Sequence, residues 1–415
     1  MKVLVIGRGG REHAVVKKLK YDGIKEIFCA PGNPGMVEAT LVDIEETNVD
    51  KLVAWALENR IDLTVVGPEM ALMAGVVDAF EAKGLKIFGP KQESAYIEGS
   101  KAFAKRLMEK YQIPTAAYGE FTHAQVEAAH AFLDQQTMPI VIKADGLAAG
   151  KGVVICQTIE EAKATVDEML VGGSFGEASA SIVIEEFLDG EEFSLMSFVA
   201  GEKFYPMPIA RDYKRAYDHD EGLNTGGMGA HSPHPLITDE DYQIALEKVV
   251  KPTVDAMIAE EKPFTGILYA GLIKTMDGPK VIEFNARFGD PETEVILPLM
   301  DNALATALLD LLAGNEPNIR WRHEQTVGVV LAAKGYPGDY AKGVPIRALN
   351  TLEGVDVYHM GTDLVDGEFV TNGGRVLFVV ASAENLAAAR EKVYAEIKKI
   401  DCDDLFYRHD IASWG

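Results

Sequence analysis

The sequence predicts a multidomain protein of mixed α/β and α+β class, with a parallel α/β domain at its N-terminus. Three features lead to this prediction. Short apolar runs alternate with amphipathic helices over the first hundred residues, strands dominate the middle third, and the last segment combines strands with a final helix. The chain of 415 residues is long enough for roughly three domains of about 150 residues each.

The composition narrows the class of protein further. With 40 basic and 64 acidic side chains the net charge is −24, which disfavours bulk nucleic-acid binding. Hydrophobic residues at 47% and charged residues at 25% are typical of a globular protein. No run approaches the roughly 20 apolar residues of a membrane span, so we expect no membrane association. Three scattered cysteines predict no disulfide framework and a reducing, cytoplasmic location.

The N-terminal third should form a parallel sheet covered by helices on both faces. We expect four buried strands, at Val3–Ile6, Glu26–Cys29, Leu63–Val66 and Ile87–Phe88. Amphipathic spacing predicts helices at Lys51–Asn59 and Ala71–Lys83. Ser100 is placed to cap the start of a further helix, Lys101–Lys110.

The remaining two thirds are richer in strands. We expect strands at Pro139–Ala144, Val153–Cys156, Ser181–Phe187, Phe193–Val199, Phe264–Thr275, Lys280–Phe284, Val327–Ala332 and Arg375–Val380. Helices are expected at Asp239–Glu260 and at Asn385–Lys398, and the sequence that follows the strand Lys280–Phe284 is also expected to be helical as far as Leu312. The segment Met207–Pro235 shows little periodicity, and an irregular loop of this length is usually functional or disordered.

A glycine-rich loop, Gly7 to His13, follows the first strand and opens a helix. Glycines there let backbone N–H groups approach a phosphate at the positive end of the helix. The loop lacks the third glycine of a dinucleotide fingerprint, where this chain has Glu12, so a nicotinamide cofactor is a poor fit. Arg8 and Arg11 suit a phosphate monoester. The alternative is a tight turn without a ligand.

A second glycine-rich loop occupies residues 143–152. Its spacing differs from a P-loop, and Gly152 stands where a P-loop has Ser or Thr. A glycine-rich turn between two strands can fold its N–H groups over phosphates, although a plain β-turn is the alternative. Lys143 lies in an otherwise apolar strand, and because an unpaired buried ammonium is costly, we expect it to have an anionic partner.

An acidic strand supplies the candidate metal ligands. Side chains alternate along a strand, so Glu283 and Asn285 point to the same side. Two oxygen ligands on one face suit Mg²⁺ or Mn²⁺ bridging nucleotide phosphates, whereas a solvated edge strand is the alternative. The nine histidines show no zinc-ligand spacing.

Taken in order, these motifs resemble those of the glycinamide ribonucleotide synthetase (phosphoribosylamine–glycine ligase) family of ATP-grasp enzymes along essentially the whole chain. The matching blocks are Gly9 to His13, Val65 to Glu69, Gly99 to Lys101, Ile142 to Gly152, Glu185 to Leu188, Asn224 to Ala230, Glu283 to Asn285, Arg287 to Glu292, and Thr371 to Leu377.

This resemblance implies an N-terminal substrate-binding domain (1–99), an ATP-grasp domain (100–318) with a mobile lid near 118–190, and a small α+β C-terminal domain (319–415). It implies that ATP converts glycine to glycyl phosphate and that the amine of 5-phosphoribosylamine displaces the phosphate. Mg²⁺ or Mn²⁺ would act as cofactor. We expect a monomer or weak dimer in the cytoplasm.

The resemblance also implies roles for individual residues. ATP would contact Lys101, Lys143, Gly146, Gly150, Lys151, Gly152, Glu185, Glu186, Phe187, Leu188 and Glu192. Phosphoribosylamine would contact Gly9, Gly10, Arg11 and Glu12, and the metal would bind Glu283 and Asn285. Asp212, Lys214, Arg215 and Arg287 would surround glycine and the transferred phosphoryl group.

Six positions depart from the family pattern, and most of them fall in the expected substrate loops. They are Arg8, Arg211, Tyr213, Leu223, His231 and Ala286. They leave open two alternatives, namely an ATP-grasp carboxylate–amine ligase with a different substrate choice and a non-catalytic ATP-binding sensor.

Overall fold

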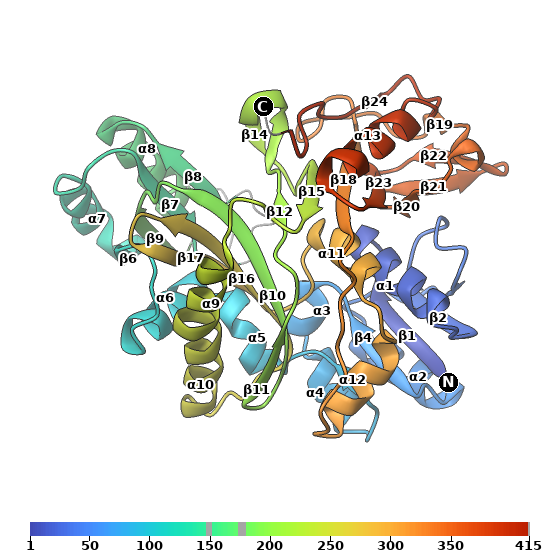
Figure 1. Cartoon of the computed structure of the whole chain (residues 1–415). Coiled ribbons are helices and arrows are strands. Elements are labelled where there is room, and N and C mark those ends of the chain that lie inside the picture. The colour runs from blue at the N-terminus through green and yellow to red at the C-terminus, as the bar shows by residue number, and fades with distance from the viewer. Residues whose placement is uncertain (147–151, 173–179, 414–415) are drawn as a thin grey trace.

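The structure is a computed structural model that describes residues 1–146, 152–172 and 180–413. The central sheet lies in the middle of the molecule. The N-terminal domain and the C-terminal domain lie on one side of it, and a separate lobe lies on the other side (Figure 1). The parallel N-terminal sheet and the antiparallel sheets that follow it confirm the predicted fold class.

The N-terminal domain is a five-stranded parallel sheet. Its strands are β3 (Thr40–Leu41), β2 (Glu26–Pro31), β1 (Lys2–Gly7), β4 (Leu63–Val66) and β5 (Ile87–Phe88), in that order across the sheet. The accompanying helices are α1 (Gly10–Tyr21), α2 (Val49–Asn59), α3 (Glu69–Met73), α4 (Val76–Glu81) and α5 (Gln92–Gly99). The prediction of one helix over Ala71–Lys83 was wrong, because Gly75, at a φ of +80°, separates α3 from α4.

The carboxyl ends of β1 and β4 lie side by side. Ile6 is in register with Val66, so the loop after β1 and the loop Gly67 to Glu69 emerge at the same sheet edge. In open parallel sheets ligands bind at this edge. Arg11 and Glu69, which follow β1 and β4, line the same cavity as residues of the central sheet.

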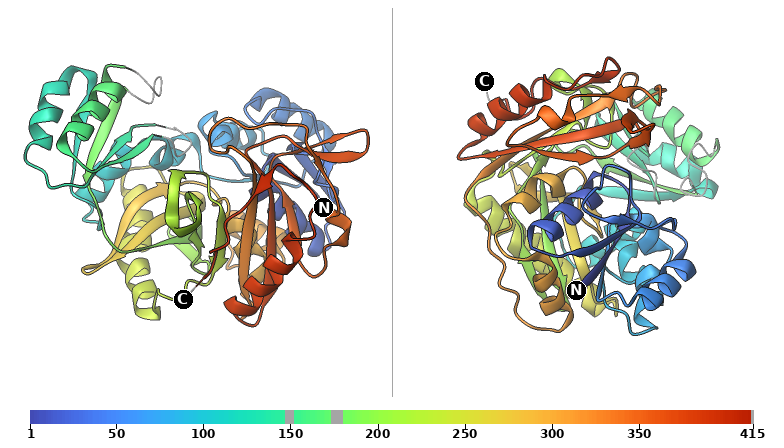
Figure 2. Two further views of the ribbon diagram at one scale, coloured as in Figure 1. Left: turned by 90° about the horizontal axis from the view of Figure 1, so that it is seen from above. Right: turned by 90° about the vertical axis from the view of Figure 1, so that its right-hand side faces the viewer.

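The separate lobe is a four-stranded antiparallel sheet with two helices. The strands are β6 (Tyr118–Thr122), β9 (Ser181–Glu186), β7 (Ile140–Ala144) and β8 (Val153–Cys156) in sheet order, and the helices are α7 (Val126–Leu133) and α8 (Ile159–Leu170). The lobe has its own hydrophobic core, which runs from Ala129 to Ile184. Seen from above, it stands apart from the other domains (Figure 2).

A second antiparallel sheet forms the body of the central domain. Its order is β11 (Lys203–Pro206), β10 (Glu191–Ala200), β16 (Thr265–Thr275) and β17 (Gly278–Asn285). Helix α6 (Lys101–Lys110) contacts β17 and is capped as predicted, since Ser100 Oγ accepts from the Phe103 N–H at 3.1 Å. The expected helix after residue 239 consists of α9 (Asp239–Ala245), a π-helical turn (Leu246–Val250) and α10 (Lys251–Ala259).

The segment Met207–Pro235 is more ordered than the sequence predicts. It contains four short strands, β12 (Arg211–Asp212), β13 (Arg215–Tyr217), β14 (Glu221–Asn224) and β15 (Gly229–Ser232). Strands of two to four residues leave too little sequence for a period of two to be seen. Strands β13 and β14 form a hairpin, whereas β12 and β15 join the C-terminal sheet.

The C-terminal domain combines that sheet with a smaller one. The main sheet has the order β12, β15, β18 (Gln325–Ala333), β23 (Arg375–Ala383) and β20 (Asp356–His359), with β24 (Leu405–Phe406) also pairing with β18. Helix α13 (Leu386–Ile397) packs on β18 and β23. The smaller sheet has the order β19 (Pro345–Ile346), β22 (Glu368–Thr371) and β21 (Thr362–Val365). Helices α11 (Glu292–Ile296) and α12 (Leu304–Leu312) connect the central and C-terminal parts.

Two properties of the whole chain follow from the described residues. Within them, no helix is both long enough and apolar enough to cross a bilayer. The three cysteines are free thiols, of which Cys29 and Cys156 are buried.

Candidate active site

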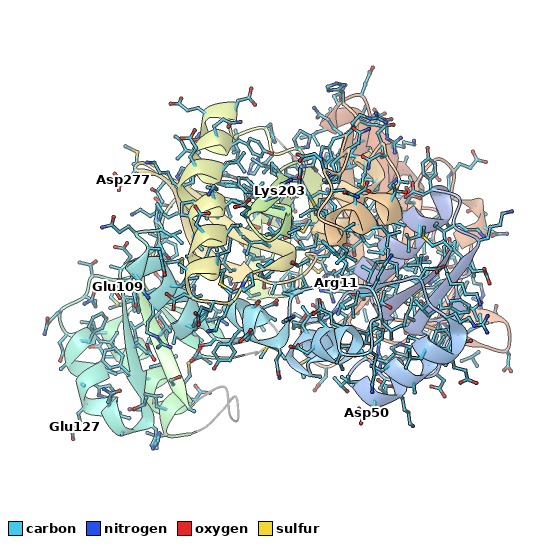
Figure 3. The ribbon with its side chains drawn as sticks, turned by 90° about the horizontal axis from the view of Figure 1, so that it is seen from below. Arg11, Asp50, Glu109, Glu127, Lys203 and Asp277 are labelled. Atoms are coloured by element: carbon cyan, nitrogen blue, oxygen red, sulfur yellow. The ribbon has the colours of Figure 1, made fainter. Side chains whose placement is uncertain are left out.

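A cavity of about 710 Å³ lies where the lobe, the central sheet, the N-terminal edge and the C-terminal domain meet. Sixteen predicted site residues line it, namely Arg11, Lys101, Lys143, Gly146, Gly152, Glu185, Glu186, Phe187, Leu188, Glu192, Asp212, Lys214, Arg215, Glu283, Asn285 and Arg287. Gly9, Gly10 and Glu12 are not among the described residues that line it, and Gly150 and Lys151 fall outside the described residues. Arg11 lies near the middle of the molecule, whereas Asp50, Glu127 and Asp277 lie at its periphery (Figure 3).

Two buried lysines share one carboxylate at the lobe end of the cavity. Glu185 Oε2 lies 3.0 Å from Lys143 Nζ and 3.2 Å from Lys105 Nζ. Glu185 is thus an anionic partner for Lys143, as the sequence suggested, and Lys143 also donates to the Ile282 carbonyl at 3.0 Å. Burial, aided by the Lys143 ammonium and opposed by Glu185, lowers the pKa of Lys105 to about 8. Two ammonium groups with a single carboxylate leave a positive charge there for an anionic ligand.

The chain between β9 and β10 connects the lobe to the central sheet. Glu186, Phe187 and Leu188 line the cavity there, and the Phe187 ring is 40% exposed although it is a large apolar group. An exposed aromatic ring that lines a cavity can stack against a planar heterocycle. Glu192, at the start of β10, pairs with Lys214 at 2.6 Å, and this lysine lowers the pKa of Glu192.

The acidic strand β17 presents Glu283 and Asn285 to the cavity. Burial alone would raise the pKa of Glu283, but the surrounding cations Lys101, Lys214, Lys143 and Arg287 lower it. The carboxylate is therefore ionised, and no ion pair within 4 Å joins it to another described residue. An ionised carboxylate and an amide oxygen on one strand are ligands that Mg²⁺ and Mn²⁺ accept. The residues present thus fit a divalent cation that shares its remaining ligands with phosphates.

Asp212 lies opposite this strand, on β12. Burial raises the pKa of Asp212 to about 7, the carboxylates of Glu292 and Glu192 add to this effect, and Lys214, 4.0 Å away, opposes it. Glu292 is 1% exposed and accepts hydrogen bonds from Ser194 Oγ at 2.9 Å and from the Tyr269 hydroxyl. This end of the cavity is acidic and suits a cationic ammonium group.

Arg287 is held by two carboxylates from the N-terminal part of the chain. Its guanidinium lies 3.3 Å from Glu69 and 3.0 Å from Glu98, and it donates to Asn285 Oδ1 at 3.2 Å. The sequence motif around Glu69 was noticed, but its pairing with a residue 218 positions away could not be. Arg287 therefore ties the N-terminal edge to the metal-ligand strand.

The first glycine loop is filled by its own glutamate. Glu12, 1% exposed, accepts from the Gly9 N–H at 2.6 Å and also pairs with Arg11. A Cβ on Gly67 would lie 1.9 Å from Glu12 Oε1, so that glycine makes room for the carboxylate. The Gly9 N–H is thus not open to a phosphate as the sequence suggested.

Three of the six departures from the family pattern lie together. Arg211 is paired with His231 in the β12–β15 register. Its guanidinium carbon lies over the Tyr213 ring, 5.0 Å from the ring centroid. The Tyr213 hydroxyl lies 3.4 Å from His231 Nδ1 and accepts from the Ala412 N–H at 3.0 Å. These side chains form one packed group behind Asp212, and Arg408, 1% exposed on its side chain, holds the neighbouring hairpin through Asp220.

The other three departures lie apart from that group. Arg8 is half exposed and pairs with Glu45. Leu223 is exposed in the β14 strand. Ala286 is buried, and its N–H donates to Glu98 Oε2 at 2.7 Å. None of these three side chains lines the cavity.

Two antiparallel sheets and a cavity that is lined with lysines and a carboxylate–amide pair define the class of protein, an ATP-grasp enzyme. The family models for phosphoribosylglycinamide synthetase match almost the whole chain, with the N domain at residues 1–98, the ATP-grasp (A) domain at 99–293 and the C domain at 326–414. The chain belongs to the phosphoribosylglycinamide synthetase family.

Individual relatives agree with this assignment. The chain is 53% identical to the phosphoribosylamine–glycine ligase of Halalkalibacterium halodurans, over 100% of this chain and 97% of that protein. It is 51% identical to the enzyme of that name from Listeria innocua, over 100% and 99% of the two chains.

Solved structures show the same relationship. The crystal structure of phosphoribosylamine–glycine ligase from Thermotoga maritima has a TM-score of 0.88 at 34% identity and covers 99% of this chain and 100% of that one. A biotin carboxylase domain from Hydrogenobacter thermophilus, at 17% identity and a TM-score of 0.76 over 98% of this chain and 91% of that one, shares the fold.

Proposed function

We propose that this chain catalyses the ATP-dependent ligation of glycine to 5-phosphoribosylamine, which forms glycinamide ribonucleotide, ADP and phosphate in purine biosynthesis. The observation that carries the proposal is the full-length identity of 53% to a phosphoribosylamine–glycine ligase. The cavity supports it, because cationic, acidic and hinge residues line a single space between the domains.

The reaction needs activation of a carboxylate. Oxide is a poor leaving group, so the γ-phosphoryl group of ATP is first transferred to a glycine carboxylate oxygen. The amine nitrogen of phosphoribosylamine then attacks the carbonyl carbon, phosphate leaves with the electron pair of the C–O bond, and the nitrogen loses a proton. No enzyme nucleophile is required, so positioning and charge neutralisation account for the catalysis.

The residues of the cavity divide this work by their chemistry. Lys101 and Lys143, with the loop from Gly146 to Gly152, would neutralise the nucleotide phosphates; the loop includes Gly150 and Lys151. The hinge from Glu185 to Leu188 would hold the adenine and Glu192 the ribose. Arg287 and Lys214 would balance the charge on the transferred phosphoryl group, with Arg215 beside them. Asp212 would hold the glycine ammonium, and the backbone at Gly9 and Gly10 would border the phosphoribosylamine.

Glu283 and Asn285 would hold Mg²⁺ or Mn²⁺. Such an ion supplies neutralisation of phosphate oxygens and fixes their orientation. The ionised state of Glu283 among four cations supports this assignment, because a carboxylate that forms no ion pair with a described residue is available to bind a metal.

We also propose domain limits of 1–99, 100–318 and 319–415, with a mobile lid near 118–190. The separate core of the lobe supports the lid. The family-model limits near residue 98 support the first boundary. Three free thiols fit a cytoplasmic location, and we expect a monomer or weak dimer.

The proposal is tested by product release. Purified protein with ATP, Mg²⁺, glycine and freshly generated phosphoribosylamine should release ADP and phosphate only when both co-substrates are present. Release with a different amino acid but not with glycine would indicate a ligase of other specificity. ATP binding with no turnover for any substrate pair would indicate a sensor, and either result would overturn the proposal.

A further inference from the structure

One arginine of the C-terminal domain reaches the cavity. Arg375, the first residue of β23, lines the cavity with a side chain that is 19% exposed. Its Nη1 atom lies 2.8 Å from Asp290 Oδ1 and donates to the Gly226 carbonyl at 2.9 Å. Asp290 Oδ2 in turn lies against Gly9, where an added Cβ would be 3.6 Å away. Arg375 thus stands where the three domains meet, next to the N-terminal glycine loop.

The contacts of Arg375 with other described residues leave its Nε and Nη2 donors without a hydrogen bond, and the side chain lines the cavity. A Cβ on Gly226 would lie 3.1 Å from both Nε and Nη2 of Arg375, so the guanidinium lies flat over a residue without a side chain. The contacts of Arg375 within the described chain use Nη1. Two parallel N–H donors of an arginine match the geometry of a phosphate.

The other cations near the N-terminal edge are already engaged. Arg11 pairs with Glu12 and donates to the Phe288 carbonyl at 3.2 Å, and Arg287 is held between Glu69 and Glu98. The amide of Gly9 donates to Glu12. The glycines of the first loop therefore allow a ligand to come close to the backbone. The positive charge that binds a phosphate at this edge has to come from a side chain outside this loop.

We propose that Arg375 binds the 5′-phosphate of the amine substrate through Nε and Nη2, with Asp290 fixing the orientation of the guanidinium. The inference rests on the proposed function and assigns to the C-terminal domain a part in substrate choice. Strands β12, β15, β18 and β23 are neighbours in one sheet, so Arg375 on β23 and Asp212 on β12 belong to the same sheet.

The experiment compares two amines on two proteins. Phosphoribosylamine, formed from ribose 5-phosphate and ammonia, is compared with ribosylamine, formed from ribose and ammonia. The wild-type protein should prefer the phosphorylated amine strongly in kcat/KM. Arg375→Met should reduce that preference by about 30-fold or more, because kcat/KM should fall much further for the phosphorylated amine than for ribosylamine. Arg375→Lys should be intermediate, because a single ammonium keeps the charge without the fork.

Controls separate binding of the phosphate from a structural role. The ATP-induced shift in melting temperature should be the same in Arg375→Met and wild type. Arg347→Met, at an exposed arginine of the same domain that pairs with Glu368, should keep the wild-type preference. Gly226→Ala should weaken the preference while keeping the arginine, because its methyl group would crowd Nε and Nη2.

The outcomes of the two proposals are distinguishable. An inactive wild-type protein overturns the proposed function. An active wild-type protein whose Arg375→Met variant keeps the full preference for the phosphorylated amine overturns the inference about Arg375 and leaves the proposed function standing.

Discussion

The carboxylate of Glu12 accepts a 2.6 Å hydrogen bond from the backbone N–H of Gly9, and it thereby closes the N-terminus of helix α1. The same side chain pairs with Arg11 and lies in space left by Gly7 and Gly67. A glycine-rich loop that looks open to a ligand phosphate is thus held by an internal carboxylate. This contact shapes the N-terminal wall of the active site.

Replacing Glu12 should therefore destabilise the protein. Glu12→Ala leaves the buried Arg11 guanidinium without its nearest carboxylate and removes the cap of α1. We expect the free energy of unfolding to fall by about 3 kcal/mol, measured by denaturant titration. Glu45→Ala, which removes the exposed partner of Arg8, should change it by less than about 0.5 kcal/mol. Equal effects of the two variants would show that the Glu12 contact is not structural.

Glu283→Gln should abolish turnover without unfolding the protein. The amide keeps the shape of the side chain but loses the charge that a divalent cation needs. We expect a fall in kcat of about 1000-fold or more, with a melting temperature close to that of wild type. Glu316→Gln, at an exposed glutamate that pairs with Lys203, is the control. A near-normal rate for Glu283→Gln would remove the metal assignment.

The use of glycine should depend on pH through Asp212. Its pKa is raised from 3.8 to about 7, mainly by burial, so the carboxylate is increasingly protonated below that pH. Because only the ionised form attracts an ammonium group, kcat/KM for glycine should rise about tenfold per pH unit up to pH 7 and then level off. Asp212→Asn should have a much lower kcat/KM that lacks this rise. If the variant showed the same pH profile as wild type, another group would be responsible.

The shared carboxylate of Glu185 predicts a coupling between stability and ATP. Glu185→Gln leaves the ammonium groups of Lys105 and Lys143 close together without a counter-charge, and should lower the free energy of unfolding by about 3 kcal/mol. ATP phosphates would restore negative charge, so ATP should raise the melting temperature more in the variant than in wild type. Glu127→Gln, at an exposed glutamate of the same lobe that does not line the cavity, should behave like wild type in both measurements. A smaller ATP shift in Glu185→Gln than in wild type would contradict this account.

Much of the fold could be predicted from local patterns. The strand Leu63–Val66 and the Ser100 cap follow from apolar runs and capping chemistry, which act over a few residues. The break at Gly75 and the short strands between Met207 and Pro235 could not be predicted in this way. The break depends on a single backbone angle. Strand β15 depends on pairing with β18, nearly a hundred residues later, and β12 depends on β15, whereas the hairpin strands β13 and β14 are too short to show a pattern.

The candidate site also contains residues that could be predicted from local sequence and residues that could not. Residues on recognisable motifs, such as Lys143 and Glu283, were found because their chemistry is unusual for a strand. Glu98, Tyr269 and Arg375 were missed as site residues. Arg375 lies in one of the blocks that match the family, but all three side chains reach the cavity only through tertiary packing. The hydrogen bond from Gly9 to Glu12 and the position of Glu12 against Gly67 could not be predicted, because these residues come together only in the folded chain.

The central claim is that ATP activates the carboxylate of glycine before the amine attacks. Glycine labelled with ¹⁸O in its carboxylate, supplied with ATP and phosphoribosylamine, tests it most directly. Transfer of the phosphoryl group to a carboxylate oxygen, followed by loss of phosphate, must carry one labelled oxygen into each phosphate released. Mass spectrometry should therefore find one ¹⁸O atom per phosphate, and release of unlabelled phosphate during glycine-dependent product formation would contradict the account.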